Sequence, residues 1–195
     1  TNRKENNPMS FPKALALSLA IVLTPAVNAA EFNHVETARS SIHFSYKQMG
    51  VNMAGRFKKF AANLKFDPSR ATAASVVLEV DLGSIDTGSA EGNSEVAGKL
   101  WFNTKAFPTA LFTSSSIKPL GGDKYEAIGK LTIKGRAQEV VAPTTVTIKG
   151  NTAEFDGAFT IKRADFAIGE GVWADFSTVA NDVPVKFHIV ATSGK

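Results

Sequence analysis

Much of the chain alternates between apolar and polar residues with a period of two, the pattern of a β-strand with one buried face. The clearest case spans residues 124–150, where two such runs flank a short turn. In the first run Leu131 and Ile133 share one face, and Lys130 lies on the other. Gly135 supplies the positive φ that a tight hairpin needs. The pattern predicts a sheet with one apolar face.

The same alternation recurs at residues 32–37, 42–47, 56–66, 76–82, 110–117, 152–161 and 183–190. Glycines at 50 and 55 predict a bend or bulge within residues 49–55. Pro184 restricts the start of the last run to an edge or bulge, because proline has no N–H to donate. About eight strands joined by turns predict an all-β fold, a single antiparallel barrel that leaves no edge exposed.

Residues 89–105 interrupt the strand pattern. Residues 91–102 predict one or two helical turns, and Pro108 marks their end. Leu100, Trp101 and Phe102 make one side of this segment strongly apolar. We therefore expect it to cover an open end of the barrel.

The N-terminal region resembles a signal peptide. Lys13 precedes an apolar run at residues 14–23, and small residues follow at Ala29 and Ala30. We predict an N-terminal extension and cleaved signal peptide at residues 1–29, followed by one domain at residues 30–195. Cleavage after Ala29 is preferred over cleavage after Ala30, and an uncleaved anchor is disfavoured because the apolar run is short.

Composition narrows the possible functions. The chain has no cysteine, so no disulfide stabilises it. Its net charge of +4 comes from scattered residues without a basic run, so no nucleic-acid partner is expected. The chain contains fourteen phenylalanines but only two tyrosines and two tryptophans. Because phenylalanine has no polar group, this bias indicates either a very apolar core or an apolar cavity.

Signals for catalysis are weak. His34, His43 and His188 lie on separate strands without metal-ligand spacing, so neither a metal nor a cofactor is expected. There is no nucleophile-elbow motif and no cysteine nucleophile. Arg163 and Asp165 are predicted to form a structural ion pair across a turn. The sequence indicates a protein that is not an enzyme.

Several stretches together resemble the YceI family of secreted, lipocalin-like proteins that bind polyisoprenoids, over about residues 32–191. They are Ser-Ile-His-Phe at 41–44, Met-Gly at 49–50, Gly-Arg-Phe at 55–57, Ser-Ile-Asp-Thr at 84–87, Trp-Phe-Asn-Thr-Lys-Ala-Phe-Pro at 101–108, Phe-Thr-Ser at 112–114, Gly-Lys-Leu-Thr-Ile-Lys-Gly at 129–135, and Arg-Ala-Asp-Phe-Ala-Ile at 163–168 with Val183 and Val185. The chain departs from the family pattern at Gln48 and at residues 92–96 and 136–139, so the resemblance assigns no head-group preference.

The resemblance implies an eight-stranded lipocalin-like barrel with a short helix near its mouth and a long apolar lumen. The candidate lining residues are Phe44, Tyr46, Phe57, Leu78, Val80, Trp101, Phe102, Phe112, Ile133, Phe159, Phe166, Trp173 and Phe187. From pattern alone, the same side chains would more readily fill a solid core. The resemblance reverses that preference for the set as a whole.

Three functions follow from these alternatives. The first is a periplasmic carrier or storage protein that buries an isoprenoid lipid, either a polyprenol or the tail of an isoprenoid quinone. Its contact with a membrane is expected to be transient, and a homodimer is compatible with it. The second is an extracytoplasmic, stress-related interaction module with a packed barrel and no lipid ligand. The third and least favoured is a hydrolase or isomerase, which would need polar residues such as Tyr46, Ser45 or Glu95 inside the lumen.

Overall fold

A computed structural model describes residues 31–194, so the predicted signal peptide lies outside the described part of the chain. Within residues 31–194 there are eleven strands and one α-helix, α1 (Ala90–Ala97). The strands are β1 (Phe32–Val35), β2 (Ser41–Gln48), β3 (Val51–Phe57), β4 (Phe60–Lys65), β5 (Ser75–Asp81), β6 (Ile85–Asp86), β7 (Thr109–Gly121), β8 (Lys124–Ile133), β9 (Arg136–Lys149), β10 (Thr152–Lys162) and β11 (Asp182–Ser193). Among these residues no helix is long and apolar enough to cross a bilayer.

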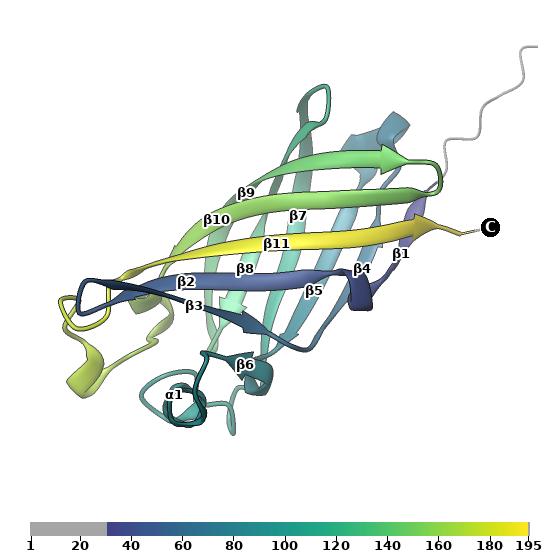
Figure 1. Cartoon of the computed structure of the whole chain (residues 1–195). Coiled ribbons are helices and arrows are strands. Elements are labelled where there is room, and N and C mark those ends of the chain that lie inside the picture. The colour runs from purple at the N-terminus through teal and green to yellow at the C-terminus, as the bar shows by residue number, and fades with distance from the viewer. Residues whose placement is uncertain (1–30, 195) are drawn as a thin grey trace, which may run out of the picture.

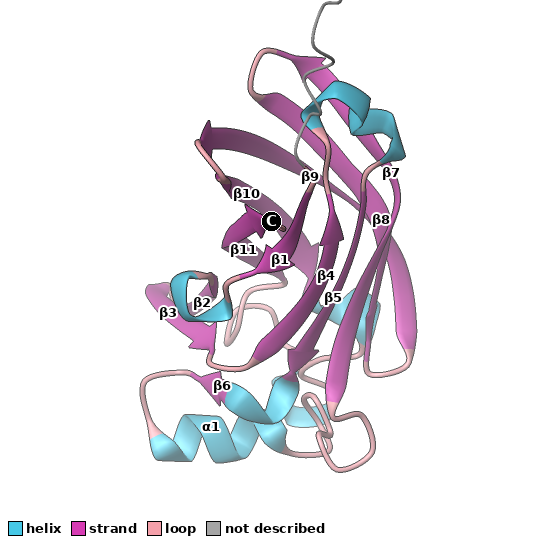
Figure 2. Ribbon diagram, turned by 90° about the vertical axis from the view of Figure 1, so that its right-hand side faces the viewer, coloured by secondary structure: helices cyan, strands magenta, loops and turns pink. Residues whose placement is uncertain are grey.

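All of these strands belong to one antiparallel sheet. Its order is β4-β5-β7-β8-β9-β10-β11-β2-β3-β6, and β1 pairs with β11 beside β2. The sheet curls on itself into a half-barrel, and α1 lies across one end (Figure 1, Figure 2). The predicted all-β antiparallel class is confirmed. The predicted count of eight strands is wrong, because the short β6 and the division between β3 and β4 leave little trace in the alternation.

The curl brings the two ends of the sheet together. The chain passes from β3 to β4 through Lys58 and Lys59 alone, although these strands stand near opposite ends of the sheet order. The backbone N–H of Lys59 donates to Ser84 Oγ at 2.9 Å, and that of Lys58 donates to Ser84 O at 3.1 Å. The single strand predicted over residues 56–66 is therefore two strands, because the chain leaves the ladder at the two lysines.

The far end of the half-barrel is closed by four aromatic residues, the aromatic plug: Phe32, Phe66, Tyr125 and Phe155. Phe32 in β1 and Phe66 after β4 exchange two backbone hydrogen bonds of 2.8 and 3.1 Å. The Phe66 ring meets Tyr125 and Phe155 edge to face, with centroid separations of 5.4 and 5.1 Å. Three of these rings, Phe66, Tyr125 and Phe155, also line the interior of the half-barrel.

Two local predictions are confirmed. Gly135 has φ +72° in the turn between β8 and β9. The ladder between β11 and β2 begins at Val185, so Pro184 faces no partner on that side.

The bend or bulge predicted within residues 49–55 is a tight turn at the start of that segment, with no bulge after it. Met49 and Gly50, both with positive φ, form a two-residue turn between β2 and β3. The register then continues without a shift through Gly55. Gly55 instead packs against the ring of Phe44, which lies opposite it in the register.

Candidate ligand-binding cavity

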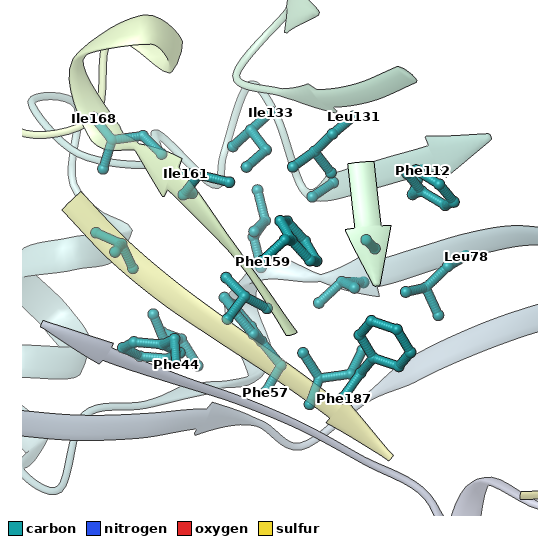
Figure 3. A pocket seen from close by; sticks show the side chains of 18 of the residues that line it. Phe44, Phe57, Leu78, Phe112, Leu131, Ile133, Phe159, Ile161, Ile168 and Phe187 are labelled. Atoms are coloured by element: carbon teal, nitrogen blue, oxygen red, sulfur yellow. The ribbon is translucent and has the colours of Figure 1, made fainter. Parts of the chain in front are cut away.

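The half-barrel encloses a cavity of about 550 Å³, a size common for small-molecule sites. Its walls are almost entirely aliphatic and aromatic, and they come from both ends of the chain. Figure 3 shows Phe44 and Phe57 from β2 and β3 facing Leu131 and Phe159 from β8 and β10 across the cavity. The alternative of a solid, packed barrel is therefore wrong.

The structure places all but one of the predicted lining residues along this cavity. They are Phe44, Tyr46, Phe57, Leu78, Val80, Trp101, Phe102, Phe112, Ile133, Phe159, Trp173 and Phe187. Phe166 is the exception, since it is 1% exposed and packs in the core outside the lining. It belongs to the 3₁₀ helix η4 (Arg163–Phe166), where the period-two rule does not hold. Contact of these residues with a ligand remains a prediction.

Glycines explain how so many phenylalanines leave the interior open. Phe44 lies opposite Gly55 in the register, and Phe187 lies opposite Gly157. In both pairs a Cβ built on the glycine would overlap the phenylalanine ring, so the ring rests on the bare backbone of the neighbouring strand. With a side chain at either glycine, the ring would have to move. The glycines thus hold the rings against the wall and keep the cavity wide.

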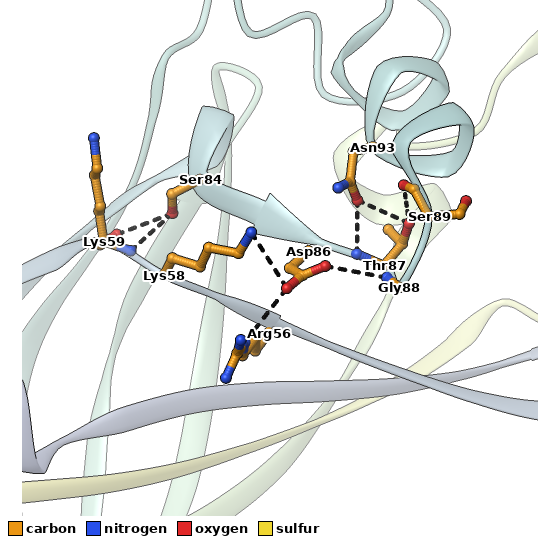
Figure 4. Close-up of polar contacts among 9 residues, drawn as sticks. All are labelled: Arg56, Lys58, Lys59, Ser84, Asp86, Thr87, Gly88, Ser89 and Asn93. Carbon is orange, nitrogen blue, oxygen red and sulfur yellow. Dashed lines mark hydrogen bonds and ion pairs between the residues drawn. The ribbon is translucent and has the colours of Figure 1, made fainter.

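The Ser-Ile-Asp-Thr stretch at residues 84–87 positions α1 at the open end, the mouth (Figure 4). Asp86 accepts from the backbone N–H of Gly88 at 3.2 Å and forms ion pairs with Arg56 and Lys58 at 3.5 and 3.3 Å. The Gly88 N–H and the Lys58 ammonium hold the pKa of Asp86 below its usual range.

The start of α1 is fixed by two side chains. Asn93 Oδ1 accepts from both the N–H and the hydroxyl of Thr87, at 2.7 and 2.9 Å. Ser89 caps the helix by accepting from the N–H of Gly92 at 3.0 Å. The predicted helix at residues 91–102 is confirmed in place, although it begins one residue earlier and ends at Ala97.

The mouth is the polar end of the cavity. Glu91 and Glu95 are four residues apart in α1 and both contribute to the lining, together with Gln48. Trp173 Nε1–H donates to Glu95 Oε1 at 2.7 Å, which links the helix to the segment before β11. The sequence interpretation missed Glu91 and Gln48, although the i, i+4 spacing of the two glutamates was a usable signal.

Of the polar candidates proposed for an enzyme, Glu95 and Tyr46 lie on the cavity wall, and Ser45 does not. Burial raises the pKa of the Tyr46 hydroxyl. The two side chains make no hydrogen bond with each other among those of residues 31–194.

Arg163 is the largest departure from the sequence interpretation. It is 2% exposed, and its N–H groups all donate to backbone carbonyls. The acceptors are Val179, Ala180, Ile168, Gly169 and Trp173, at 2.7 to 3.2 Å. Asp165 is exposed, so the predicted ion pair is wrong. Burial lowers the pKa of Arg163, and the guanidinium pins the loop between β10 and β11 to the wall of the cavity.

The outer face of the sheet carries a separate polar cluster. His188 and Asp156 are cross-strand neighbours on β11 and β10, with Nδ1 and Oδ1 2.7 Å apart. The sequence interpretation did not pair His188 with a carboxylate, because these residues meet only through the strand register. Among the described residues no group of three or more His, Asp or Glu side chains is placed to hold a metal ion.

A curled antiparallel sheet with an apolar cavity and a helix across its mouth defines a lipocalin-like fold. Comparison with known proteins specifies the family. A model of the YceI-like domain matches residues 34–191, and the chain belongs to the YceI family. It is similar to UPF0312 proteins of Vibrio cholerae (29% identity, 80% of this chain and 86% of the relative) and Yersinia pestis (31% identity, 79% and 85%).

Solved structures agree with this assignment. BcnA of Burkholderia cenocepacia is 49% identical with a TM-score of 0.79, covering 81% of this chain and 99% of that one. A polyisoprenoid binding domain from Saccharophagus degradans, implicated in plant cell wall breakdown, shares the fold at 18% identity and a TM-score of 0.66, covering 85% and 99%. The Campylobacter jejuni YceI protein also shares the fold, with 21% identity and a TM-score of 0.69, covering 74% of this chain and 87% of that one. These structures share the fold of this chain.

Proposed function

We propose that this protein carries or stores an isoprenoid lipid, either a polyprenol or an isoprenoid quinone, with the tail buried in the cavity. The observation that supports this most directly is a cavity of about 550 Å³ with apolar walls, a polar mouth and an aromatic plug at its far end. A chain with one polar end matches that arrangement. Membership of the YceI family and the fold shared with a polyisoprenoid binding domain support the same ligand class.

Tail burial supplies the affinity in this proposal. Each buried methylene-sized group contributes about 0.8 kcal/mol, so an isoprene unit with its five carbons contributes about 4 kcal/mol before ordering costs. Two or three such units in a preformed cavity are enough for tight binding. The polar groups of the mouth then orient the ligand.

The direct test is extraction of lipids from the protein purified from its native host, followed by mass spectrometry. We expect an isoprenoid in stoichiometric amount. Both tryptophans of the chain, Trp101 and Trp173, line the cavity, so uptake of added geranylgeraniol is expected to change the intrinsic fluorescence. Protein that is lipid-free as isolated and that also shows no saturable response to the alcohol would contradict the proposal.

The carrier is proposed to act in the periplasm and to contact the membrane transiently. The first element of support is the predicted signal peptide at residues 1–29. The second is a set of exposed apolar residues beside the mouth, the rim: Met49, Val51, Val172 and Phe176, with 70, 60, 81 and 48% exposure. The two segments that carry the rim are joined by the hydrogen bond from Met49 N–H to Thr178 O, 2.9 Å. Residues 41–57 contain no acidic residue, whereas the segment of Val172 and Phe176 also carries Glu170 and Asp175.

Changing the rim is expected to slow lipid transfer. In the double variant Met49→Ser, Val172→Ser, the transfer of a fluorescent prenol from vesicles containing phosphatidylglycerol should become at least tenfold slower. The reason is that each side chain contributes about 1.5–3 kcal/mol when inserted into hydrocarbon. Stopped-flow fluorescence measures the rate.

The matched control is Val77→Ser, Leu111→Ser, which alters two equally apolar side chains, each 37% exposed and remote from the rim. The control should transfer lipid at the wild-type rate. Equal slowing by both double variants, or by neither, would mean that the rim does not mediate membrane contact.

A further inference from the structure

Of the charged side chains that line the cavity, the anionic ones are open to a ligand and the cationic one is not. The residues that line the cavity include one cation, Arg163, and two anions, Glu91 and Glu95. All N–H groups of Arg163 already donate to backbone carbonyls, so its guanidinium has no donor left for a phosphate. The two glutamates are exposed at the mouth, and Glu91 has no hydrogen-bond partner among residues 31–194.

Other cations near the mouth do not change this balance. Arg56 and Lys58 form ion pairs with Asp86. Lys134 is paired with Glu170 at 2.9 Å and also donates to Ala167 O. None of these three basic side chains lines the cavity.

We propose that the cavity selects isoprenoids with an uncharged, hydroxyl-bearing head group, such as a polyprenol or a hydroquinone, and discriminates against isoprenyl phosphates of the same chain length. This inference rests on the proposed function. The apolar, plugged end takes the tail, which leaves the head group at the carboxylates. A hydroxyl donates a hydrogen bond to a carboxylate, whereas a phosphate offers only negative charge and acceptor oxygens.

A second polar group of the lining is the indole of Trp101. The indole Nε1–H of Trp101 is buried and has no acceptor among the described residues. The Trp101 ring belongs to the lining and lies 5.5 Å from the ring of Trp173, whose own N–H contacts Glu95. A buried donor without a partner is costly. The nitrogen is itself buried, and an alcohol and a phosphate both bring acceptor oxygens, so this donor does not discriminate between the two head groups.

The test compares geranylgeraniol with geranylgeranyl phosphate, followed by tryptophan fluorescence at low and high salt. We expect the alcohol to bind at least tenfold more tightly at low salt, because two carboxylates at the mouth repel a phosphate and not an alcohol. The difference should shrink at high salt. Phosphate binding that equals or exceeds binding of the alcohol would overturn the inference and leave the proposed function standing. Binding of neither ligand would overturn the proposed function, and this inference with it.

Variants assign the discrimination to particular residues. The double variant Glu91→Gln, Glu95→Gln is expected to bind the phosphate several-fold more tightly, and glutamine at 95 keeps an acceptor oxygen for Trp173. Glu79→Gln, Glu139→Gln changes the net charge by the same amount at two exposed positions outside the lining. If this control improves phosphate binding as much, or if the mouth variant leaves it unchanged, the glutamates do not select the head group.

Discussion

Replacement of Arg163 by methionine is expected to lower the free energy of unfolding by about 3–5 kcal/mol, as breaking a buried charged network does. The guanidinium is 2% exposed and holds five backbone carbonyls of the loop between β10 and β11. Methionine fills similar space but leaves these acceptors unpaired. For a protein of this size the change corresponds to a melting temperature roughly 6–20 °C lower, measurable by calorimetry.

Two further variants sharpen this prediction. Arg163→Lys keeps the charge but offers three donors instead of five, so it should fall between wild type and methionine. Lys162→Met alters the adjacent, exposed residue and should leave the melting temperature within a degree or two. If Arg163→Met has the same melting temperature as Lys162→Met, the loop is held by contacts other than those of the guanidinium.

Replacement of Ala127 by tryptophan is expected to lower isoprenoid affinity at least a hundredfold. Ala127 lines the cavity from β8, so an indole there occupies space that the tail needs. Displacing one isoprene unit loses about 4 kcal/mol of burial, more than the roughly 2.7 kcal/mol of a hundredfold change. The stability of the variant should be unchanged or higher, because the ring fills an existing void.

The matched control is Lys130→Trp, on the same strand with its side chain exposed. It should retain wild-type affinity in the geranylgeraniol titration. If Ala127→Trp binds the alcohol as tightly as Lys130→Trp does, the tail does not occupy this part of the cavity.

Alternation along the chain was enough to predict most strands and which of their residues share an inner face, whereas a cavity along that face was implied only by the family resemblance. Phe44 and Tyr46, for example, follow Ile42 at intervals of two, and all three line the cavity. The rule failed where the backbone is not extended. Phe166 was placed on the wall as part of the set that the family resemblance implies, but the 3₁₀ helix that contains it turns its ring into the core.

Arg163 could not be interpreted from local sequence for a different reason. Its acceptors stand five to seventeen positions further along the chain, and no motif marks a carbonyl as an acceptor. Asp165, two positions away, looked like the natural partner because opposite charges at short spacing commonly pair. The fold instead buries the guanidinium among backbone oxygens and leaves the carboxylate in solvent.

The sequence by itself determined an all-β chain with one apolar face per strand and enough phenylalanine for a large apolar interior. Only the tertiary structure decided that this interior is hollow. The rings of Phe44 and Phe187 rest on Gly55 and Gly157 of neighbouring strands, and this contact depends on a register that pairs residues far apart in the chain. Side-chain period identifies a face, whereas the space left between facing walls depends on the curl of the whole sheet and on which residues stand opposite one another.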